Sequence, residues 1–497
     1  MLKKIPAHWT VVLVLLGVVL IALAIRVSLA LRYPTLDDAY ITFRYARNLA
    51  RGLGFVYNPG EHVLGTTTPL FALVLAPFNF FGFDIILLSK LINSVASTIN
   101  VILVFMITRR RLGEWAAVVS AMLLAITPSA VWGASTGMET EFNVTILFAA
   151  GYAFIAKRYA LTAVLSALAV ITRADDLLFF LVIIGWQSLK GLRVKREWGH
   201  AIKMASVFGL CLLPWVWFAM LYFGSPIPSS ILSKAAASRV SIFDNAVLYV
   251  EQFGFGINTP RALVATFLFL LGLIYLGHAH DDFLIFPFYF GVYSAAFVLL
   301  GVRLGAGWYW QPLWPTYCII FGAGIKWLIE IIQHFSPPRF LPQHGKLISV
   351  MLALLIALVW FGSLKARFID NPLAADKAIP SLEAAGRWLE RNAAADAKIG
   401  LEPIGAVGWF SDRYIIDFVA LVSPAGREIN ERLGAVDFFG NLRAFQPDYY
   451  LAWEDQGVAI VTATPEQHEW FYRHYQQAAR FGGGDTISFI LFKKISR

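Results

Sequence analysis

The chain has 497 residues, of which 58% are hydrophobic and only 15% are charged, with a net charge of +9. A soluble domain has about 25% charged residues, so this deficit, together with repeated long apolar runs, indicates an integral membrane protein. The Lys and Arg residues lie mostly in short loops between apolar runs, as in cytoplasmic loops of membrane proteins, and this pattern argues against a nucleic-acid partner. Cys211 and Cys318 both lie in apolar runs, which predicts small core side chains and no disulfide or metal pair.

The first apolar run, from about Thr10 to Leu31, predicts an uncleaved membrane helix. Lys3 and Lys4 precede it and place the N-terminus in the cytoplasm. Arg26, near the predicted outer end, is expected to extend to the lipid headgroups. An outer loop over residues 32–68 follows, and apolar residues at helical spacing predict an amphipathic surface helix from Asp38.

The next apolar run, Leu70 to Phe81, is too short to cross a bilayer, for which about 17–25 residues are typical. We therefore predict a re-entrant or juxtamembrane helix here. Ten further membrane helices are predicted near residues 85–108, 114–126, 142–156, 161–171, 177–189, 201–223, 262–276, 283–302, 312–332 and 347–364.

Eleven crossings in all place the second long loop, residues 224–261, on the outer side, and the C-terminal region there too. With this topology the basic clusters at 3–4, 109–111, 157–158, 190–196 and 339–346 are all cytoplasmic.

From about residue 366 the composition changes to that of a soluble α/β domain. An amphipathic helix begins near Ser381, and strands are predicted at 398–401, 413–418, 458–461 and 487–492. The domain contains no cysteine, so we expect it to fold without disulfides.

The predicted outer face collects acidic, basic and aromatic residues that suit a membrane-embedded enzyme. A carboxylate can take a proton from an attacking hydroxyl, and Arg or Lys can bind a phosphate leaving group. Asp37, Asp38 and Glu139 are also candidate ligands for a divalent cation such as Mg²⁺, Mn²⁺ or Ca²⁺. The candidate residues are Asp37, Asp38, Arg44, Glu139, Arg173, Asp175, Lys234, Trp308 and Tyr309.

Each candidate also has a purely structural interpretation. Asp37 and Asp38 suit a helix cap, and Glu139 suits a favourable charge at a helix start. Arg173 and Asp175 suit a local ion pair, and the aromatic residues around Trp308 suit an interfacial belt. The histidines and acids of residues 278–282 fall on the cytoplasmic side, where a polar turn is the simpler interpretation than a metal site.

Several blocks resemble bacterial GT-C glycosyltransferases, and most closely their arabinofuranosyl- and mannosyltransferase-like members. The blocks occur in the family's order and span most of the membrane region, with a weaker likeness at 407–417 and 421–424. They are Asp37–Leu49, Gly54–Glu61, Gly65–Leu70, Gly137–Thr140, Ile171–Asp175, Phe223–Ser230 and Trp308–Pro315.

The resemblance implies a polytopic GT-C membrane domain at residues 1–365 and an extracytoplasmic α/β domain at 366–497, in the bacterial inner membrane. It implies inverting transfer of a sugar from a polyprenyl-phosphate donor to a hydroxyl of a glycan, lipid or protein acceptor during envelope assembly. Asp37 or Asp38 would be the base, and Arg44, Arg173 and Lys234 would bind the donor phosphate. The remaining candidates, Glu139, Asp175, Trp308 and Tyr309, would contact the sugar or acceptor.

Two blocks depart from the family's pattern. Arg173-Ala174-Asp175 stands where relatives often have Arg-Pro-Asp or Arg-Pro-Glu, and Ser229-Ser230 stands where they tend to have Asn-Thr. The alternatives to an enzyme are a secondary transporter, which would require paired intramembrane charges and broken helices, and a non-catalytic assembly protein that binds a lipid-linked glycan.

Overall fold

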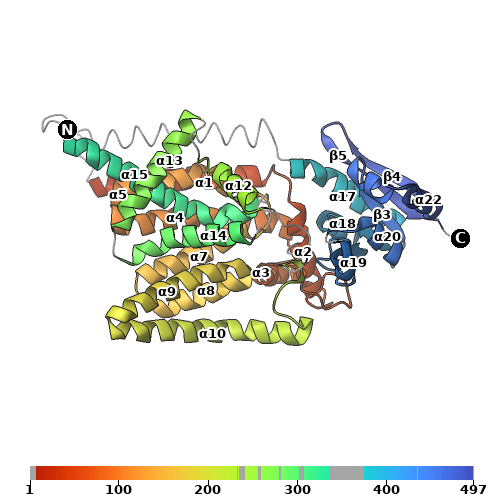
Figure 1. Ribbon diagram of the computed structural model, residues 1–497, viewed down its shortest axis with the longest axis horizontal. Helices are drawn as coiled ribbons and strands as arrows, with labels where there is room; N and C mark the ends of the chain where they lie inside the picture. Colours follow the sequence, from red (N-terminus) through yellow and green to blue (C-terminus); the bar gives the residue numbers. More distant parts are fainter. Residues whose placement is uncertain are drawn as a thin grey trace.

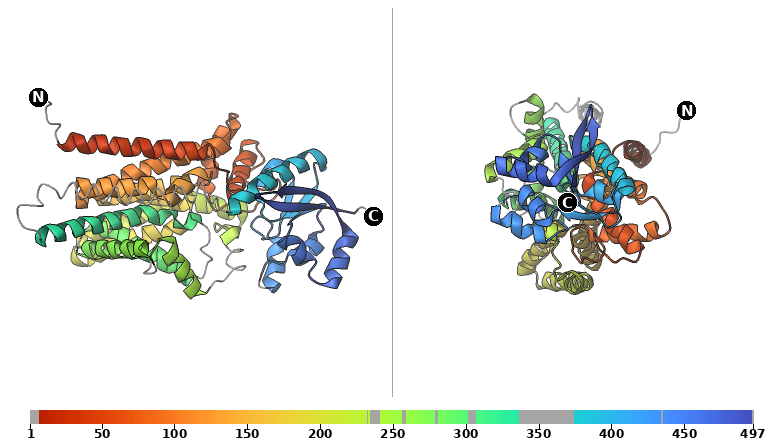
Figure 2. Two further views of the ribbon diagram at one scale, coloured as in Figure 1. Left: turned by 90° about the horizontal axis from the view of Figure 1, so that it is seen from above. Right: turned by 90° about the vertical axis from the view of Figure 1, so that its right-hand side faces the viewer.

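The computed structural model describes residues 7–231, 233, 241–255, 259–278, 281–300, 307–335, 374–433 and 435–495. A bundle of apolar helices occupies one end of the molecule and a domain with a β-sheet occupies the other, with α2 and α3 where the two meet (Figure 1). The left-hand view of Figure 2 shows the same division from above. The predicted helix 347–364 and the basic cluster 339–346 fall outside the described residues.

Within the described residues, five helical segments are long and apolar enough to cross a membrane, or six if a bent pair forms one span. The protein therefore lies in a membrane, whereas eleven crossings and their orientation stay predictions. The bundle helices are α1 (Ala7–Ala30), α4 (Ile85–Leu112), α5 (Glu114–Ile126), α6 (Pro128–Ser135), α7 (Thr140–Ile155), α8 (Tyr159–Thr172), α9 (Leu177–Arg193), α10 (Lys195–Phe223), α12 (Ile242–Gln252), α13 (Pro260–Gly277), α14 (Ile285–Leu299) and α15 (Trp314–Phe335).

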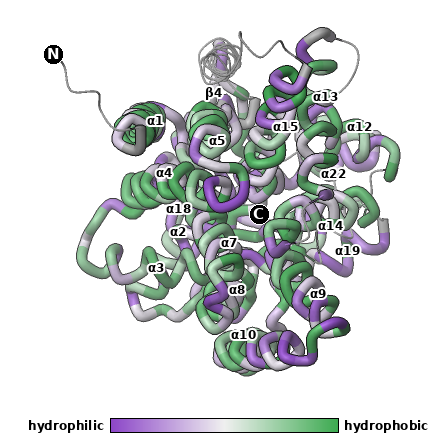
Figure 3. The backbone as a smooth tube through the Cα atoms, turned by 90° about the vertical axis from the view of Figure 1, so that its left-hand side faces the viewer, coloured by the Kyte–Doolittle hydropathy of each residue, from purple (hydrophilic) through white to green (hydrophobic). Residues whose placement is uncertain are grey.

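Large apolar side chains cover the outward side of α10, where Leu210, Trp217 and Leu221 are each about two-thirds or more exposed, at 68%, 66% and 74%. An exposed apolar surface of this kind is stable only against lipid or a partner. In an end view, hydrophobic residues follow most bundle helices, and hydrophilic stretches gather at several of the turns (Figure 3). This pattern matches a bundle immersed in a bilayer.

Helix α4 is the central element of the bundle and packs against α1, α5 and α7. Arg26 of α1 is fully buried at this junction, donating to Ser97 Oγ at 2.8 Å and to the Ala125 carbonyl at 2.8 Å. The prediction that Arg26 extends to the headgroups is wrong. The last carbonyls of α5 have no partner within their own helix, and the guanidinium satisfies them.

The short segments between α1 and α4 form two helices, α2 (Asp37–Ala50) and α3 (Pro69–Phe80), which pack on each other. The helix predicted from Asp38 is thus confirmed, although it is not a free surface helix. Ten of its fourteen residues are buried, because the C-terminal domain covers it.

The C-terminal domain is a five-stranded sheet with helices against it, in the strand order β2-β1-β3-β5-β4. Strands β1 and β2 and strands β1 and β3 pair in parallel, whereas β5 pairs antiparallel with β3 and β4. The elements are α17 (Ala374–Asn392), β1 (Lys398–Leu401), α18 (Gly405–Ser411), β2 (Tyr414–Asp417), α19 (Ala425–Leu433), α20 (Phe438–Phe445), β3 (Tyr449–Trp453), α21 (Gln456–Val461), α22 (Pro465–His474), β4 (Tyr475–Gly483) and β5 (Thr486–Lys494).

Three of the four predicted strands coincide with β1, β2 and β5. The strand predicted at 458–461 is wrong, because these residues end the short helix α21, and strands β3 and β4 were not predicted.

Candidate active site

The two adjacent acids that open α2 have different surroundings. The Asp37 carboxylate accepts two backbone hydrogen bonds from the C-terminal domain, from Gly405 N–H and Ala406 N–H, each at 2.7 Å. Asp38, the next residue, is half-buried like Asp37, but its carboxylate accepts no hydrogen bond from the described residues. Burial raises the pKa of Asp37 to about 7, although the two N–H donors act in the opposite direction.

The loop that carries Glu139 is attached directly to the start of α2. Leu36 N–H donates to the Thr136 carbonyl at 3.0 Å. Gly137 has a φ of +82°, and a Cβ there would press on the Thr35 methyl at 3.0 Å. Glycine is therefore required by both conformation and space, and the loop brings Glu139 towards the two acids of α2.

Polar residues of α4 hold the start of α7, which follows this loop. Asn93 Oδ1 accepts from the backbone N–H groups of Glu141 and Phe142, each at 3.1 Å. Asn100 Nδ2 donates to Glu141 Oε2 at 3.0 Å. Glu141 is thus bound in the bundle interior. Glu139 instead faces the loop after α8, which carries Arg173.

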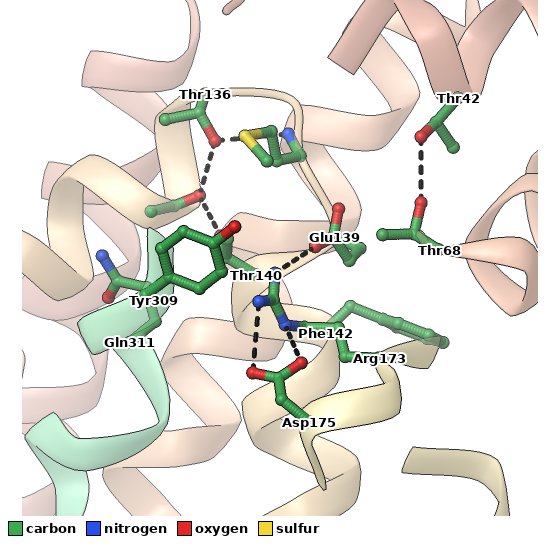
Figure 4. Close-up of polar contacts among 12 residues, drawn as sticks. Thr42, Thr68, Thr136, Glu139, Thr140, Phe142, Arg173, Asp175, Tyr309 and Gln311 are labelled. Carbon is green, nitrogen blue, oxygen red and sulfur yellow. Dashed lines mark hydrogen bonds and ion pairs between the residues drawn. The ribbon is translucent and has the colours of Figure 1, made fainter. Parts of the chain in front are cut away.

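Arg173 follows α8 and joins the loop that carries Glu139 to its own loop, which carries Asp175. It does so through buried ion pairs (Figure 4). Its Nη1 lies 3.0 Å from Glu139 Oε1, and its Nε and Nη2 each lie 3.2 Å from an oxygen of Asp175. The Tyr309 ring lies beside the same guanidinium, with its centroid 5.6 Å from Cζ. We call Glu139, Arg173, Asp175 and Tyr309 the arginine cluster.

Two further side chains extend the arginine cluster, one from α14 and one from the 3-10 turn Ala174–Asp176 that precedes α9. Tyr293 Oη lies 2.7 Å from Asp175 Oδ2 and 3.0 Å from the Tyr309 carbonyl oxygen, and it can donate its one proton to either. Asp176 is buried beside Asn143, and neither of its oxygens accepts a hydrogen bond of normal geometry from the described residues. The cluster therefore contains three carboxylates for one guanidinium.

The electrostatics of the arginine cluster follow from this imbalance. Burial works against the charged form of Arg173, but Asp175 and Glu139 outweigh it and raise the pKa of Arg173 well above its usual value. Burial raises the pKa of Glu139 despite the neighbouring guanidinium. Burial, together with the charge of Asp175, raises the pKa of Asp176 well above that of a free carboxyl. The site thus favours the charged form of Arg173 and disfavours the charged forms of Glu139 and Asp176 relative to a free carboxyl.

Three threonine hydroxyls meet, one from α2 and two from the loop before α3, and Figure 4 shows Thr42 and Thr68 in one view with the arginine cluster. Thr42 Oγ1 lies 2.9 Å from Thr68 Oγ1 and 3.2 Å from Thr66 Oγ1. Hydroxyls can both donate and accept, so such a group suits contacts to sugar hydroxyls or phosphate oxygens.

Not every predicted site residue lies in this region. Arg44 instead donates to the Tyr57, Gly408 and Arg413 carbonyls, at 2.8, 2.6 and 2.6 Å, and therefore joins α2 to the C-terminal domain. Trp308 lies next to Tyr309, with ring centroids 5.9 Å apart. Lys234 falls outside the described residues.

The predicted metal ligands are not arranged as one donor set. Both oxygens of Asp37 accept backbone hydrogen bonds, and one oxygen of Glu139 binds Arg173. Among the described residues no group of three or more His, Cys, Asp or Glu side chains could hold a metal ion. The divalent cation proposed at Asp37, Asp38 and Glu139 therefore stays a prediction.

Sequence patterns offered no signal for several residues of the site. Tyr293 lies within an apolar run, where it looks like an ordinary core aromatic. Gly405 and Ala406 lie more than 360 positions from Asp37. The threonines lie within the sequence blocks Asp37–Leu49 and Gly65–Leu70. The repeated threonine at 66–68 could therefore have indicated residues of the site.

Solved structures of similar shape exist for the whole chain. ArnT from Cupriavidus metallidurans bound to undecaprenyl phosphate matches with a TM-score of 0.62 and 12% identity, over 98% of both chains. The Archaeoglobus fulgidus oligosaccharyltransferase with zinc and sulfate matches with a TM-score of 0.57 and 12% identity, over 94% of this chain and 73% of that one. The same archaeal enzyme, AglB, with an inhibitory peptide and a dolichol-phosphate matches with a TM-score of 0.51 and 13% identity, over 97% and 74%.

Sequence comparisons add one match. Residues 373–490 match a family model described as a domain of unknown function, DUF8728. No curated protein matches the chain in sequence. The structural likeness shows that the chain shares the fold of ArnT and of the archaeal oligosaccharyltransferase, with a C-terminal α/β domain.

Proposed function

We propose that the protein is an inverting glycosyltransferase that moves a sugar from a polyprenyl-phosphate donor to an acceptor hydroxyl on the extracytoplasmic face of the bacterial inner membrane. The observation that carries the proposal is the position of the arginine cluster within a GT-C fold. A backbone hydrogen bond between Leu36 and Thr136 joins its Glu139 loop to the acids of α2. Structures of similar fold bind undecaprenyl phosphate or dolichol-phosphate, which supports a lipid-linked donor.

Asp38 is the base in this proposal. Both acids are half-buried, and both oxygens of Asp37 already accept hydrogen bonds, whereas the Asp38 carboxylate accepts none from the described residues. The Asp38 carboxylate takes the proton of the acceptor hydroxyl as its oxygen attacks the anomeric carbon. The bond from that carbon to the donor phosphate breaks, and the lipid phosphate leaves with the electron pair. One displacement of this kind inverts the anomeric configuration.

The arginine cluster forms the sugar side of the site in this proposal. Carboxylates such as Glu139 and Asp175 accept hydrogen bonds from sugar hydroxyls. Arg173 binds both of them, so we assign it the orientation of these acids in preference to direct phosphate binding. Lys234 is retained as the proposed phosphate ligand. The glycan, lipid or protein acceptor belongs to envelope assembly.

The test is transfer by the full chain in proteoliposomes, from a panel of undecaprenyl-phosphate sugars that includes arabinofuranosyl and mannosyl donors. We expect Asp38→Asn to lower kcat by at least about 10²-fold, the scale of general base catalysis, while binding of undecaprenyl phosphate stays unchanged. Full transfer by Asp38→Asn would contradict its role as the base. Uptake of a solute without sugar transfer would instead indicate a transporter.

A further inference from the structure

Helix α18 of the C-terminal domain lies against α2, the helix that begins with the candidate base. The N-terminal end of α18 meets a carboxylate, since Gly405 N–H and Ala406 N–H donate to Asp37. The first N–H groups of a helix have no partner within the helix. Asp37 therefore supplies from the membrane domain the acceptor that a capping side chain would normally supply locally.

The C-terminal end of α18 meets the arginines of the same helix α2. Arg44 donates to the Gly408 carbonyl at 2.6 Å, and Arg47 donates to the Trp409 carbonyl at 2.9 Å. Arg47 and Arg51 also pair with Asp412, each at 2.8 Å. An anion thus lies at the positive end of α18 and cations lie at its negative end, which is the favourable arrangement for the helix dipole.

The close approach of the two helices depends on glycines in α18. A Cβ on Gly405 would overlap the Asp37 carbonyl oxygen, and a Cβ on Gly408 would overlap the Tyr57 hydroxyl and lie 2.8 Å from Arg44 Nη1. Neither glycine has a positive φ. Space at the interface, and not backbone conformation, therefore explains both glycines.

We propose that α18 is a positioning element for catalysis, and that Asp37 is the positioning residue through which the C-terminal domain fixes the start of α2 and hence the carboxylate of Asp38. The inference rests on the proposed function and deepens it. Successive residues in a helix point about 100° apart, so fixing Asp37 in the interface also fixes the direction of Asp38. Misplacement of a catalytic group by about 1 Å can cost 10²-fold in rate.

The proposal gives a role to a domain that the family model leaves without one. α18 and its partner Asp412 lie within residues 373–490, which the model of unknown function covers. The C-terminal domain would then be part of the catalytic apparatus, and not a separate binding module attached to it.

The experiment compares Asp37→Asn, Gly405→Ala and the double variant in the full chain, with transfer kinetics from undecaprenyl-phosphate sugars and amide hydrogen exchange of residues 404–411. We expect each single variant to lower kcat at least about tenfold with an unchanged KM for the lipid donor. The double variant should be no slower than the slower single variant, because both changes break one contact. Exchange at Gly405 and Ala406 should become faster in Asp37→Asn.

Two matched controls separate this effect from general damage. Asp84 accepts from Ile86 N–H and Leu87 N–H at the start of α4, so Asp84→Asn makes the same change of a carboxylate to an amide at a helix start away from the interface. A Cβ on Gly199 of α10 meets no atom within 4 Å, so Gly199→Ala is a matched glycine change. Both controls should keep the kcat of the wild-type protein.

Several outcomes would overturn the inference. They are an unchanged kcat with unchanged exchange in Asp37→Asn, losses that multiply in the double variant, and a rise in KM without a fall in kcat. If Gly405→Ala does not fold, Asp37→Asn alone decides, since it changes no volume.

Absence of transfer by the wild-type protein from every donor refutes the proposed function, and the role of Asp37 with it. Normal transfer with an insensitive Asp37→Asn refutes the inference alone.

Discussion

At the scale of single residues, Asp37 and Asp38 show how two identical neighbours acquire different chemistry. Asp37 accepts two backbone N–H bonds from a distant domain, whereas the Asp38 carboxylate beside it accepts none from the described residues. The same division separates the acids of the Glu139 loop. Glu139 pairs with Arg173, whereas Glu141 is bound by Asn100 inside the bundle. In both cases the residue type is the same, and the tertiary partner decides the role.

The raised pKa of Asp37 predicts a specific pH dependence of stability. Its folded value of about 7 exceeds the value of about 3.9 for a free Asp, so the folded protein binds more protons than the unfolded chain between these pH values. Stability from this proton is present at low pH and is lost as the pH rises through about 7. Asp37→Asn does not titrate, so we expect its Tm relative to that of the wild-type protein to be higher at pH 8 than at pH 5.

Thermal unfolding of both proteins in one detergent, at pH 5 and pH 8, measures this difference. Glu402, whose pKa burial also raises to about 7, is present in both proteins, so its effect largely cancels. A Tm difference that is equal at the two pH values would show that Asp37 does not titrate in this range.

At the scale of elements, helices formed where long apolar runs predicted them, because a membrane helix satisfies its own backbone hydrogen bonds. The predicted ends are mostly within a few residues of α4, α5, α7, α9 and α10. The short apolar run Val458–Val461 was misassigned because four apolar residues do not distinguish a strand from a buried helix turn. Its neighbours in the fold, and not its own composition, decide between the two.

The pair α13 and α15 offers a prediction at this scale. A Cβ on Gly324 of α15 would overlap the Leu268 carbonyl oxygen of α13, and a Cβ on Gly272 would overlap the Ile320 carbonyl oxygen of α15. Small residues that allow backbones to approach closely are typical of membrane helix pairs. We expect Gly324→Ala to destabilise the protein by about 1–3 kcal/mol, the usual cost of overpacking.

Unfolding in detergent measures the effect of Gly324→Ala, with Gly291→Ala on α14 as the control. A Cβ on Gly291 meets no atom within 4 Å, so this change should be neutral or slightly stabilising. Equal stability of the Gly324→Ala and wild-type proteins would mean that α13 and α15 separate without cost.

At the scale of the whole molecule, the helix bundle and the C-terminal domain share one interface around α2. Beyond α18, the loop after β2 also contacts the membrane domain. Ser233 Oγ donates to the Ala420 carbonyl at 2.8 Å, and a Cβ on Gly65 would overlap the Val422 side chain. Segments from both predicted outer loops therefore meet the C-terminal domain, which is consistent with all three lying on one side of the membrane.

The proposed orientation places the C-terminal domain outside the cytoplasm and the α9–α10 turn inside. We expect a cysteine at exposed Glu466 to react with a membrane-impermeant thiol reagent in intact cells, and a cysteine at exposed Arg193 to react only after the membrane is opened. Cys211 and Cys318 are replaced by serine first, since both are free thiols. Labelling of the Arg193 position in intact cells would reverse the topology.

The sequence by itself determined the membrane class, most helix positions and the change to an α/β domain, and it supplied the acidic and basic residues of the proposed site as predictions. These follow from apolar run length, charge placement and motif blocks, which are properties of neighbouring residues. Only the tertiary structure decided that Arg26 is buried, that Arg44 binds the C-terminal domain, and that Asp37 and Asp38 have separate surroundings. Each of these depends on which distant backbone group satisfies a buried charge, and no local pattern carries that information.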